Sequence, residues 1–129
     1  MTERGLADTS VFTARESGRS IKVGAMPGRL AVSVITIGEL RAGVLAATDA
    51  ATRDLRLDTL TAALSLEPIH VDAEVANAWA RLRLALRDAG QRMPVNDSWI
   101  AATALALGVP VVTQVDDFPK LDDLAVIHV

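Results

Sequence analysis

Short apolar runs alternate with longer amphipathic stretches along most of the chain. Runs of a few aliphatic and β-branched residues predict strands, whereas apolar residues that recur every three or four positions predict helices. The predicted strands are Gly5–Ala7, Leu30–Val34, Glu67–Val71, Pro110–Thr113 and Leu124–Val129. The predicted helices run from Asp8 to about Glu16, over Ile35–Ala47, Ala51–Leu66 and Asp72–Ala89, and from Asn96 or Asp97 to Gly108.

Strands that alternate with helices predict a parallel sheet covered on both faces, the arrangement of the α/β class. The segment Ser17–Leu30, with several glycines and a proline, predicts a loop with room for one short helix. The length of 129 residues suits one domain, which we expect to span residues 1–129. Functional residues of such sheets collect at the carboxyl ends of the strands.

Composition excludes several kinds of site. The chain has no cysteine, which rules out disulfides and thiolate metal ligands, and its two histidines, His70 and His128, are expected to be non-catalytic strand residues. No apolar run reaches the roughly 20 residues that span a bilayer, and the first residues lack a signal-peptide core. We therefore expect a cytoplasmic protein without membrane association. The net charge of -3 argues against broad electrostatic binding of nucleic acid.

Acidic residues stand beside apolar stretches in separate parts of the chain. They are Asp8, Glu39, Asp97 and the pair Asp116–Asp117. A carboxylate in such a place is costly unless solvent, hydrogen bonds or a cation compensate its charge. Several carboxylates gathered at one site repel one another, and a hard divalent cation such as Mg2+ relieves that repulsion. The pattern predicts a metal site assembled from distant parts of one fold.

Each acid also has a structural interpretation. Asp8 is placed to cap a helix, and Glu39 stands three residues after Thr36, the spacing of a capping box. Asp97 in a first helical turn would stabilise the helix dipole, and Asp116–Asp117 would form a solvated turn. Taken singly, none of these positions shows whether its carboxylate has a structural or a catalytic role.

The sequence blocks around the acids follow a characteristic order. They are DTSVF at 8–12, GEL at 38–40 followed by Gly43, NDSWIAATALALGVPVVT at 96–113, and TQVDDF at 113–118. Together they resemble the PIN-domain ribonucleases, and within them the VapC toxins of bacterial VapBC toxin–antitoxin modules. The resemblance covers nearly the whole chain. It implies a three-layer α/β/α PIN-like domain around a central, mainly parallel sheet of about five strands.

The resemblance also implies an activity. It points to a metal-dependent endoribonuclease that is the toxin of a type II toxin–antitoxin system and uses Mg2+, with Mn2+ as an alternative cofactor. Asp8 and Asp97 would bind the metal directly. Glu39 would bind a second metal or orient the attacking water, and Asp117 would bind through water. These four acids are the expected catalytic and metal-binding residues.

One position departs from the family pattern. Related sequences commonly carry an acid or asparagine where Val115 stands, whereas Asp117 matches the remaining family acid. A valine there predicts weaker metal binding, and Asp116 is expected to point elsewhere. The alternative function is therefore a non-catalytic PIN-like module that binds RNA or a partner through a weakened metal site. A phosphoacceptor receiver domain is disfavoured, because one acid follows the first strand and no lysine follows the last.

Other residues have expected supporting roles. Thr9 and Thr113 would hold a carboxylate or the substrate phosphate, and Asn96 would orient Asp97. The basic residues that follow the first acid, and are candidates for contact with the RNA backbone, are Arg15, Arg19 and Lys22.

Two associations are expected. Apolar surface near Trp79 and Leu82 and on the central helices predicts a homodimer. The acidic pocket would attract a basic side chain from a VapB-like antitoxin.

Overall fold

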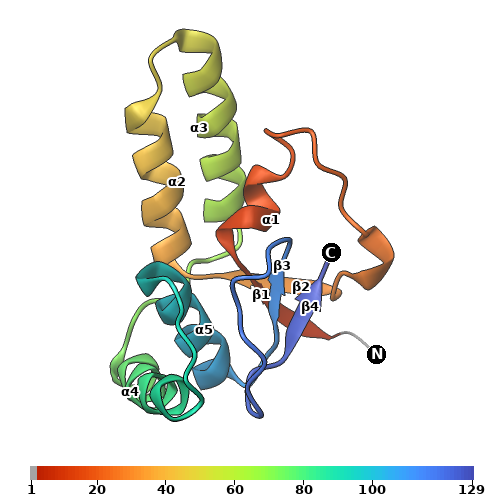
Figure 1. Ribbon diagram of the computed structural model, residues 1–129. Coiled ribbons are helices and arrows are strands. Elements are labelled where there is room, and N and C mark those ends of the chain that lie inside the picture. Colours follow the sequence, from red (N-terminus) through yellow and green to blue (C-terminus); the bar gives the residue numbers. More distant parts are fainter. Residues whose placement is uncertain (1–2) are drawn as a thin grey trace.

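The sheet forms the middle of the molecule. The computed structural model describes residues 3–129 and contains a 4-stranded parallel sheet with the order β2-β1-β3-β4 (Figure 1). The strands are β1 (Arg4–Ala7), β2 (Arg29–Val32), β3 (Val111–Thr113) and β4 (Val126–His128). The α/β class and the parallel sheet expected from the sequence are confirmed.

The segment 67–71, predicted as a further strand, makes a single bridge to the sheet, with Ile69 opposite Ser33. Glu67 adopts the left-handed conformation with φ 56°, and Pro68 has no amide hydrogen to donate. A regular ladder therefore does not form there.

Helices connect the strands. They are α1 (Thr9–Thr13), α2 (Val34–Ala46), α3 (Ala50–Leu64), α4 (Ala73–Asp88) and α5 (Val95–Leu107), with a 3-10 turn, η1, at Val23–Ala25. Within residues 3–129, none of these helices is long and apolar enough to cross a membrane. Gly108 ends α5 in the left-handed conformation with φ 68°, as the sequence predicts.

The start of α2 differs from the prediction. Ser33 caps this helix, because its Oγ accepts a hydrogen bond from the amide of Ile35 at 3.0 Å. Thr36 is buried inside the helix instead of capping it. The predicted capping box between Thr36 and Glu39 is therefore wrong, because β2 ends earlier than expected and the helix begins earlier.

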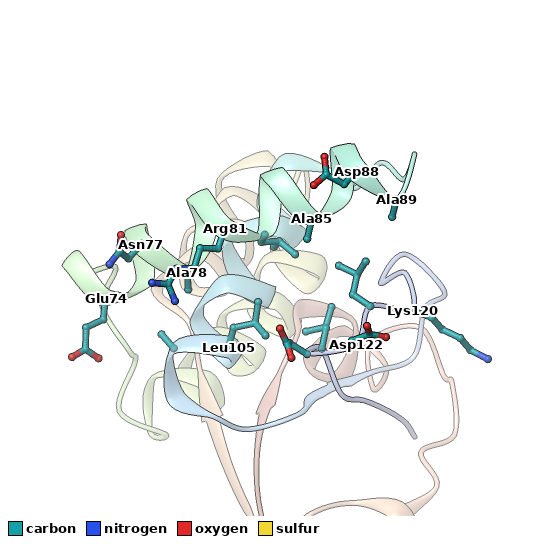
Figure 2. Close-up of a pocket in the computed structure, with 15 residues that line it drawn as sticks. Glu74, Asn77, Ala78, Arg81, Ala85, Asp88, Ala89, Leu105, Lys120 and Asp122 are labelled. Atoms are coloured by element: carbon teal, nitrogen blue, oxygen red, sulfur yellow. The ribbon is translucent and has the colours of Figure 1, made fainter.

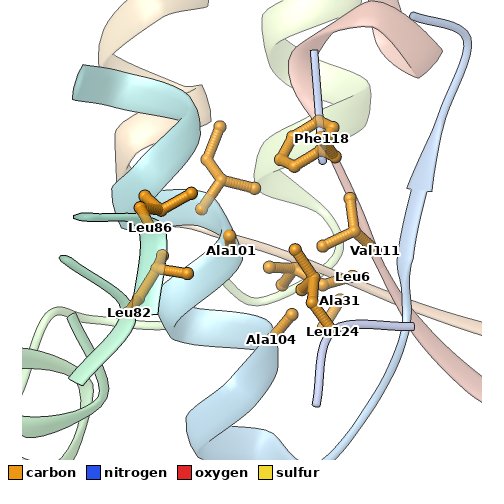
Figure 3. Packing of buried hydrophobic residues seen from close by; sticks show 10 residues of the cluster. Leu6, Ala31, Leu82, Leu86, Ala101, Ala104, Val111, Phe118 and Leu124 are labelled. Atoms are coloured by element: carbon orange, nitrogen blue, oxygen red, sulfur yellow. The ribbon is translucent and has the colours of Figure 1, made fainter. Parts of the chain in front are cut away.

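The larger core lies between the sheet and the helices α4 and α5 (Figure 3). Leu6 and Val111 of the two central strands pack there against Ile100 of α5. Leu82 of α4 is only 2% exposed in this core, so it does not supply the free apolar surface that we expected for a dimer. The other buried members of the core are Ala31, Leu86, Ala101, Ala104, Phe118 and Leu124.

The opposite face of the sheet is covered by α1 and the loop that follows it. Ala7 and Val112 pack there against Val11 of α1. Gly5 allows the loop to approach closely, because a Cβ at this position would lie 2.7 Å from Cγ2 of Val112 and 2.8 Å from Cγ of Pro27. Layers on both faces thus fix the carboxyl ends of β1 and β3.

The helices α2 and α3 stand side by side as a hairpin that extends away from the sheet (Figure 1). Leu40 and Val44 of α2 pack against Leu60 of α3. On the outside of the hairpin, Leu45 is 70% exposed and Leu64 is 48% exposed. These side chains are apolar surface that the chain alone does not cover.

Candidate active site

The candidate site lies at the carboxyl ends of the two central strands. The chain turns from β1 to β2 on one side, whereas β3 joins β1 on the other side. Such a reversal of strand order leaves a crevice at the carboxyl edge of a parallel sheet. Asp8 follows β1 directly, and Asp117 lies in the segment after β3. The helix α5 starts at the same edge and carries Asp97 in its first turn.

Asp8 is a buried carboxylate held by hydroxyl groups. Its Oδ1 accepts hydrogen bonds from the amide and the hydroxyl of Ser10, at 3.1 and 2.6 Å. Its Oδ2 accepts from Oγ1 of Thr113 at 2.9 Å. Burial raises the pKa of Asp8, and the hydrogen bonds from Ser10 and Thr113 oppose that rise. Asp8 also caps α1, so its structural and candidate chemical roles coexist.

Glu39 extends from α2 toward the same edge. Its Oε1 lies 2.6 Å from the hydroxyl of Thr9, which is also 3.0 Å from Oγ1 of Thr36. The side-chain amide of Asn96 donates to Oε2 of Glu39 at 3.4 Å. We expected Asn96 to orient Asp97, but in the structure its side chain forms a hydrogen bond with Glu39 instead. Thr9 and Thr113 each hold a carboxylate, which is one of the two roles expected of them.

The pKa of Asp97 indicates that the acids interact electrostatically. Its pKa is raised to about 6, first by burial and then by the negative charges of Asp117, Asp8 and Glu39. A hydrogen bond with Asp117 adds to the rise. The carboxylates named by the sequence motifs therefore form one electrostatic cluster.

The donor set of this cluster fits a hard divalent cation. All of its charged donors are carboxylate oxygens, and their mutual repulsion favours any bound positive charge. Within residues 3–129, Arg87 forms an ion pair with Asp88 and His128 lies beside Asp116, so no basic side chain pairs with a carboxylate of the cluster. Also within this range, no three acidic or histidine side chains lie close enough together to bind one ion as they stand. Carboxylates can therefore shift one another's pKa without being close enough to share an ion, because charge–charge interactions act over longer distances than coordination bonds of about 2.1 Å.

Val115 and Asp116 do not contribute to the charges that act on Asp97. Val115 is half-buried and packs against the core that contains Leu6. Asp116 is fully exposed, and its Oδ1 lies 3.4 Å from Nε2 of His128. Asp116 thus contacts His128 of β4, and whether it joins the site stays a prediction.

The sequence interpretation missed two polar residues at the site. The hydroxyl of Ser10 contacts Asp8 and also accepts a hydrogen bond from the amide of Gln114 at 2.9 Å. The side chain of Gln114 accepts from Nε of Arg19 at 2.8 Å. Both residues follow buried strands at the carboxyl edge, which is the signal that identifies them in retrospect.

The tryptophans belong to the contact between two helices. Trp79 of α4 and Trp99 of α5 are stacked with ring centroids 4.3 Å apart, and Nε1 of Trp79 donates to Oγ of Ser98 at 3.0 Å. The guanidinium carbon of Arg83 lies over the ring of Trp79, 4.9 Å from its centroid. Both rings are half-buried, in agreement with the core or interface role expected for them.

A separate cavity of about 860 Å³ lies between α4, the end of α5 and the turn at 120–124 (Figure 2). Ala85, Leu105 and Leu124 are among its apolar walls, and Arg81 and Asp122 are among its charged residues. None of the clustered carboxylates lines it. It is therefore distinct from the candidate site.

Comparison with known proteins agrees with this geometry. A family model described as PIN domain matches residues 6–124. The chain belongs to the PIN-domain family. It is 46% identical to Ribonuclease VapC5 of Mycobacterium tuberculosis over 125 residues, which cover 97% of this chain and 93% of that one. It is 45% identical to Ribonuclease VapC4 of the same organism over 131 residues, covering 98% and 97% of the two chains.

A solved structure gives the same relationship. The crystal structure of VapBC-5 from M. tuberculosis, a member of the VapBC family of toxin-antitoxin systems, matches with a TM-score of 0.90 and 43% identity. The match covers 98% of both chains. The expected PIN-like fold is thereby confirmed.

Proposed function

We propose that this protein is a metal-dependent endoribonuclease and the toxin of a type II toxin–antitoxin pair. The observation that carries the proposal is the cluster of Asp8, Glu39, Asp97 and Asp117, in which burial and like charges raise the pKa of Asp97 to about 6. The family supports it, because relatives that share nearly the whole chain are named ribonucleases.

The four carboxylates would hold Mg2+ or Mn2+, both of which prefer oxygen ligands. A cation bound there supplies charge relief at the phosphate and a more acidic water nucleophile. Thr113 and Ser10 fix the two oxygens of Asp8, so that this buried carboxylate keeps one orientation. Asp97 must be ionised to act as a ligand, which it is at neutral pH because its pKa is about 6.

Glu39 is positioned differently from the aspartates. Thr9 contacts one of its oxygens and Asn96 donates to the other, so both sides of the carboxylate are defined. A carboxylate with this support, in a crevice shared with a phosphodiester, is suited to orient an attacking water. We assign that role to Glu39 and metal binding through water to Asp117.

We also propose the two associations. The solved relative of 43% identity comes from a toxin-antitoxin system, and a carboxylate cluster with which no basic side chain of residues 3–129 forms an ion pair would bind an inhibitory arginine or lysine of an antitoxin. A homodimer would cover exposed apolar side chains of the α2–α3 hairpin, such as Leu45 and Leu64. Sedimentation at micromolar concentration checks the dimer, and only monomer would contradict it.

The alternative is a non-catalytic module that binds RNA or a partner. Val115 favours it, because an apolar side chain stands where related sequences commonly carry a polar one and packs on the core. Incubation of the purified protein with a panel of transfer, ribosomal and messenger RNAs separates the two functions. Cleavage with Mg2+ or Mn2+ that stops in EDTA supports the nuclease. RNA binding without cleavage at any metal concentration supports the module.

A further inference from the structure

Arg19 is an exposed arginine that neutral groups hold beside the acidic site. Its Nε donates to Oε1 of Gln114 at 2.8 Å, and its Nη2 donates to the carbonyl oxygen of Ser10 at 3.1 Å and to Oγ1 of Thr13 at 3.2 Å. None of these acceptors is a carboxylate. Its positive charge is therefore fixed in position without being neutralised.

Gln114 connects this guanidinium to the site. Its Nε2 donates to the carbonyl oxygen of Ser20 at 2.8 Å and to the backbone oxygen of Val129 at 3.3 Å, which fixes the amide plane. Its backbone amide donates to Oγ of Ser10, and that hydroxyl donates to Oδ1 of Asp8 at 2.6 Å. Two hydrogen-bonded residues thus link Arg19 to a carboxylate of the cluster.

This arrangement suits a phosphate group. An arginine binds phosphate through a planar fork of N–H groups, and fixing the fork beforehand removes most of the entropy cost of binding. Within residues 3–129, Nη1 of Arg19 makes no hydrogen bond, and no carboxylate lies within ion-pair distance of its guanidinium. The neighbouring carboxylates repel the RNA backbone, so a fixed positive charge beside them is needed where the backbone approaches.

We propose that Arg19 binds a backbone phosphate of the RNA substrate and that Gln114 is its positioning residue. The proposal rests on the proposed function, which makes RNA the substrate. Arg15 and Lys22 also follow Asp8 in the sequence, but within residues 3–129 their side chains make no hydrogen bond. Only the guanidinium of Arg19 is held in place among these three basic groups. The competing explanation is that Arg19 only fastens its loop to the end of β3.

The test measures RNA binding by fluorescence anisotropy at several NaCl concentrations. The probe is a fluorescein-labelled single-stranded RNA of mixed sequence, and all proteins carry Asp97→Asn so that the probe is not cut. Arg19→Gln removes the charge. Arg53→Gln is the matched control, because Arg53 is also exposed and its Nη2 also donates to a neutral oxygen, the carbonyl of Ala47 at 2.8 Å, on the hairpin away from the acids.

The proposal predicts a specific pattern. Arg19→Gln weakens RNA binding roughly tenfold and lowers the slope of log affinity against log salt by about 0.7, the value for one phosphate of a single strand. Arg53→Gln changes neither quantity. Gln114→Ala releases the guanidinium but keeps its charge, so affinity falls roughly threefold while the salt slope is unchanged.

Three results of the binding assay would overturn the proposal. One is an Arg19→Gln protein that binds RNA as tightly as the Arg53→Gln protein, even if its melting temperature is lower. If circular dichroism shows that Arg19→Gln does not fold, the RNA affinities of Gln114→Ala and Arg19→Lys are measured in its place. Parent-like affinity in both of these variants would then be the second contradicting result. A parent protein that binds no RNA at all would be the third.

Kinetics separate this proposal from the proposed function. With Asp97 intact, Arg19→Gln should raise KM for RNA cleavage and leave kcat nearly unchanged, because the contact is remote from the reacting atoms. If the wild type cleaves RNA and Arg19→Gln has an unchanged KM, the role of Arg19 is contradicted but the nuclease function is not. If the wild type binds RNA through Arg19 but never cleaves it, the nuclease function is contradicted but the role of Arg19 is not.

Discussion

Replacing Asp97 by asparagine should stabilise the protein at neutral pH while removing its activity. The side chain is partly buried among three other acids, and its pKa rises from 3.8 to about 6. An acid with a raised pKa stabilises the folded state when it is protonated. This contribution is complete below about pH 3.8 and is lost as the pH rises through about 6. At neutral pH the wild-type protein therefore carries a charge that opposes folding.

The size of the effect follows from the shift. A rise from 3.8 to about 6 corresponds to about 3 kcal/mol between the two protonation states. Because the carboxyl group is only half buried, solvent screening reduces the expected gain in Asp97→Asn to about 1–2 kcal/mol. The side-chain volume hardly changes, so no cavity forms to offset that gain. Asp116→Asn is the matched control, since Asp116 is fully exposed and outside the cluster.

Urea denaturation in EDTA, at about pH 5 and about pH 7.5, measures this difference. Asp97→Asn should have the higher free energy of unfolding at the upper pH, and its advantage should shrink at the lower pH. Added Mg2+ should stabilise the wild type and should stabilise Asp97→Asn much less. Equal shifts of the unfolding free energy in Asp97→Asn and Asp116→Asn at both pH values would show that Asp97 carries no unfavourable charge in the folded protein.

The remaining predictions concern acidity, metal affinity and packing. At Mg2+ concentrations that leave the site partly empty, RNA cleavage should fall as the pH drops through about 6, because protonation of Asp97 competes with cation binding; a rate that is flat between about pH 5 and 7 under these conditions would contradict this. Val115→Asp should tighten Mn2+ binding measured by calorimetry, whereas equal affinities would show that this position does not reach the metal. Gly5→Ala should lower the free energy of unfolding by about 1–3 kcal/mol, because its Cβ would lie 2.7 Å from Val112 and 2.8 Å from Pro27; unchanged urea denaturation would refute that packing.

The sequence was sufficient to predict the fold class because its patterns are local. Strand and helix periods can be recognised within short windows, and alternation of the two implies a parallel sheet. The exception is the segment 67–71, where a left-handed Glu67 and the following proline limit pairing to one bridge. The start of α2 was also misplaced, because Ser33 and Thr36 are both good caps and only the end of β2 decides between them.

The acids were located from motifs, whereas their supporting contacts depend on tertiary structure. Asp8 and Asp97 stand in recognisable blocks of sequence, and the topology brings the end of β1 and the start of α5 to one edge. The hydrogen-bond partners of Gln114 are Ser10, Arg19, Ser20 and Val129, and the first three lie more than 90 positions away in sequence, so no local pattern indicates them. The chemical roles of the acids stay predictions until variants are measured.

The most direct measurement of the central claim is the Mg2+ dependence of RNA cleavage by three proteins. They are the wild type, Asp97→Asn and Asp116→Asn, compared on one RNA that the wild type cuts. We predict that Asp116→Asn cleaves at nearly the wild-type rate and that Asp97→Asn is slower by at least roughly 100-fold at every Mg2+ concentration. An Asp97→Asn protein that cleaves at the wild-type rate, or cleavage by the wild type that persists in EDTA, would contradict a metal centre built on these carboxylates.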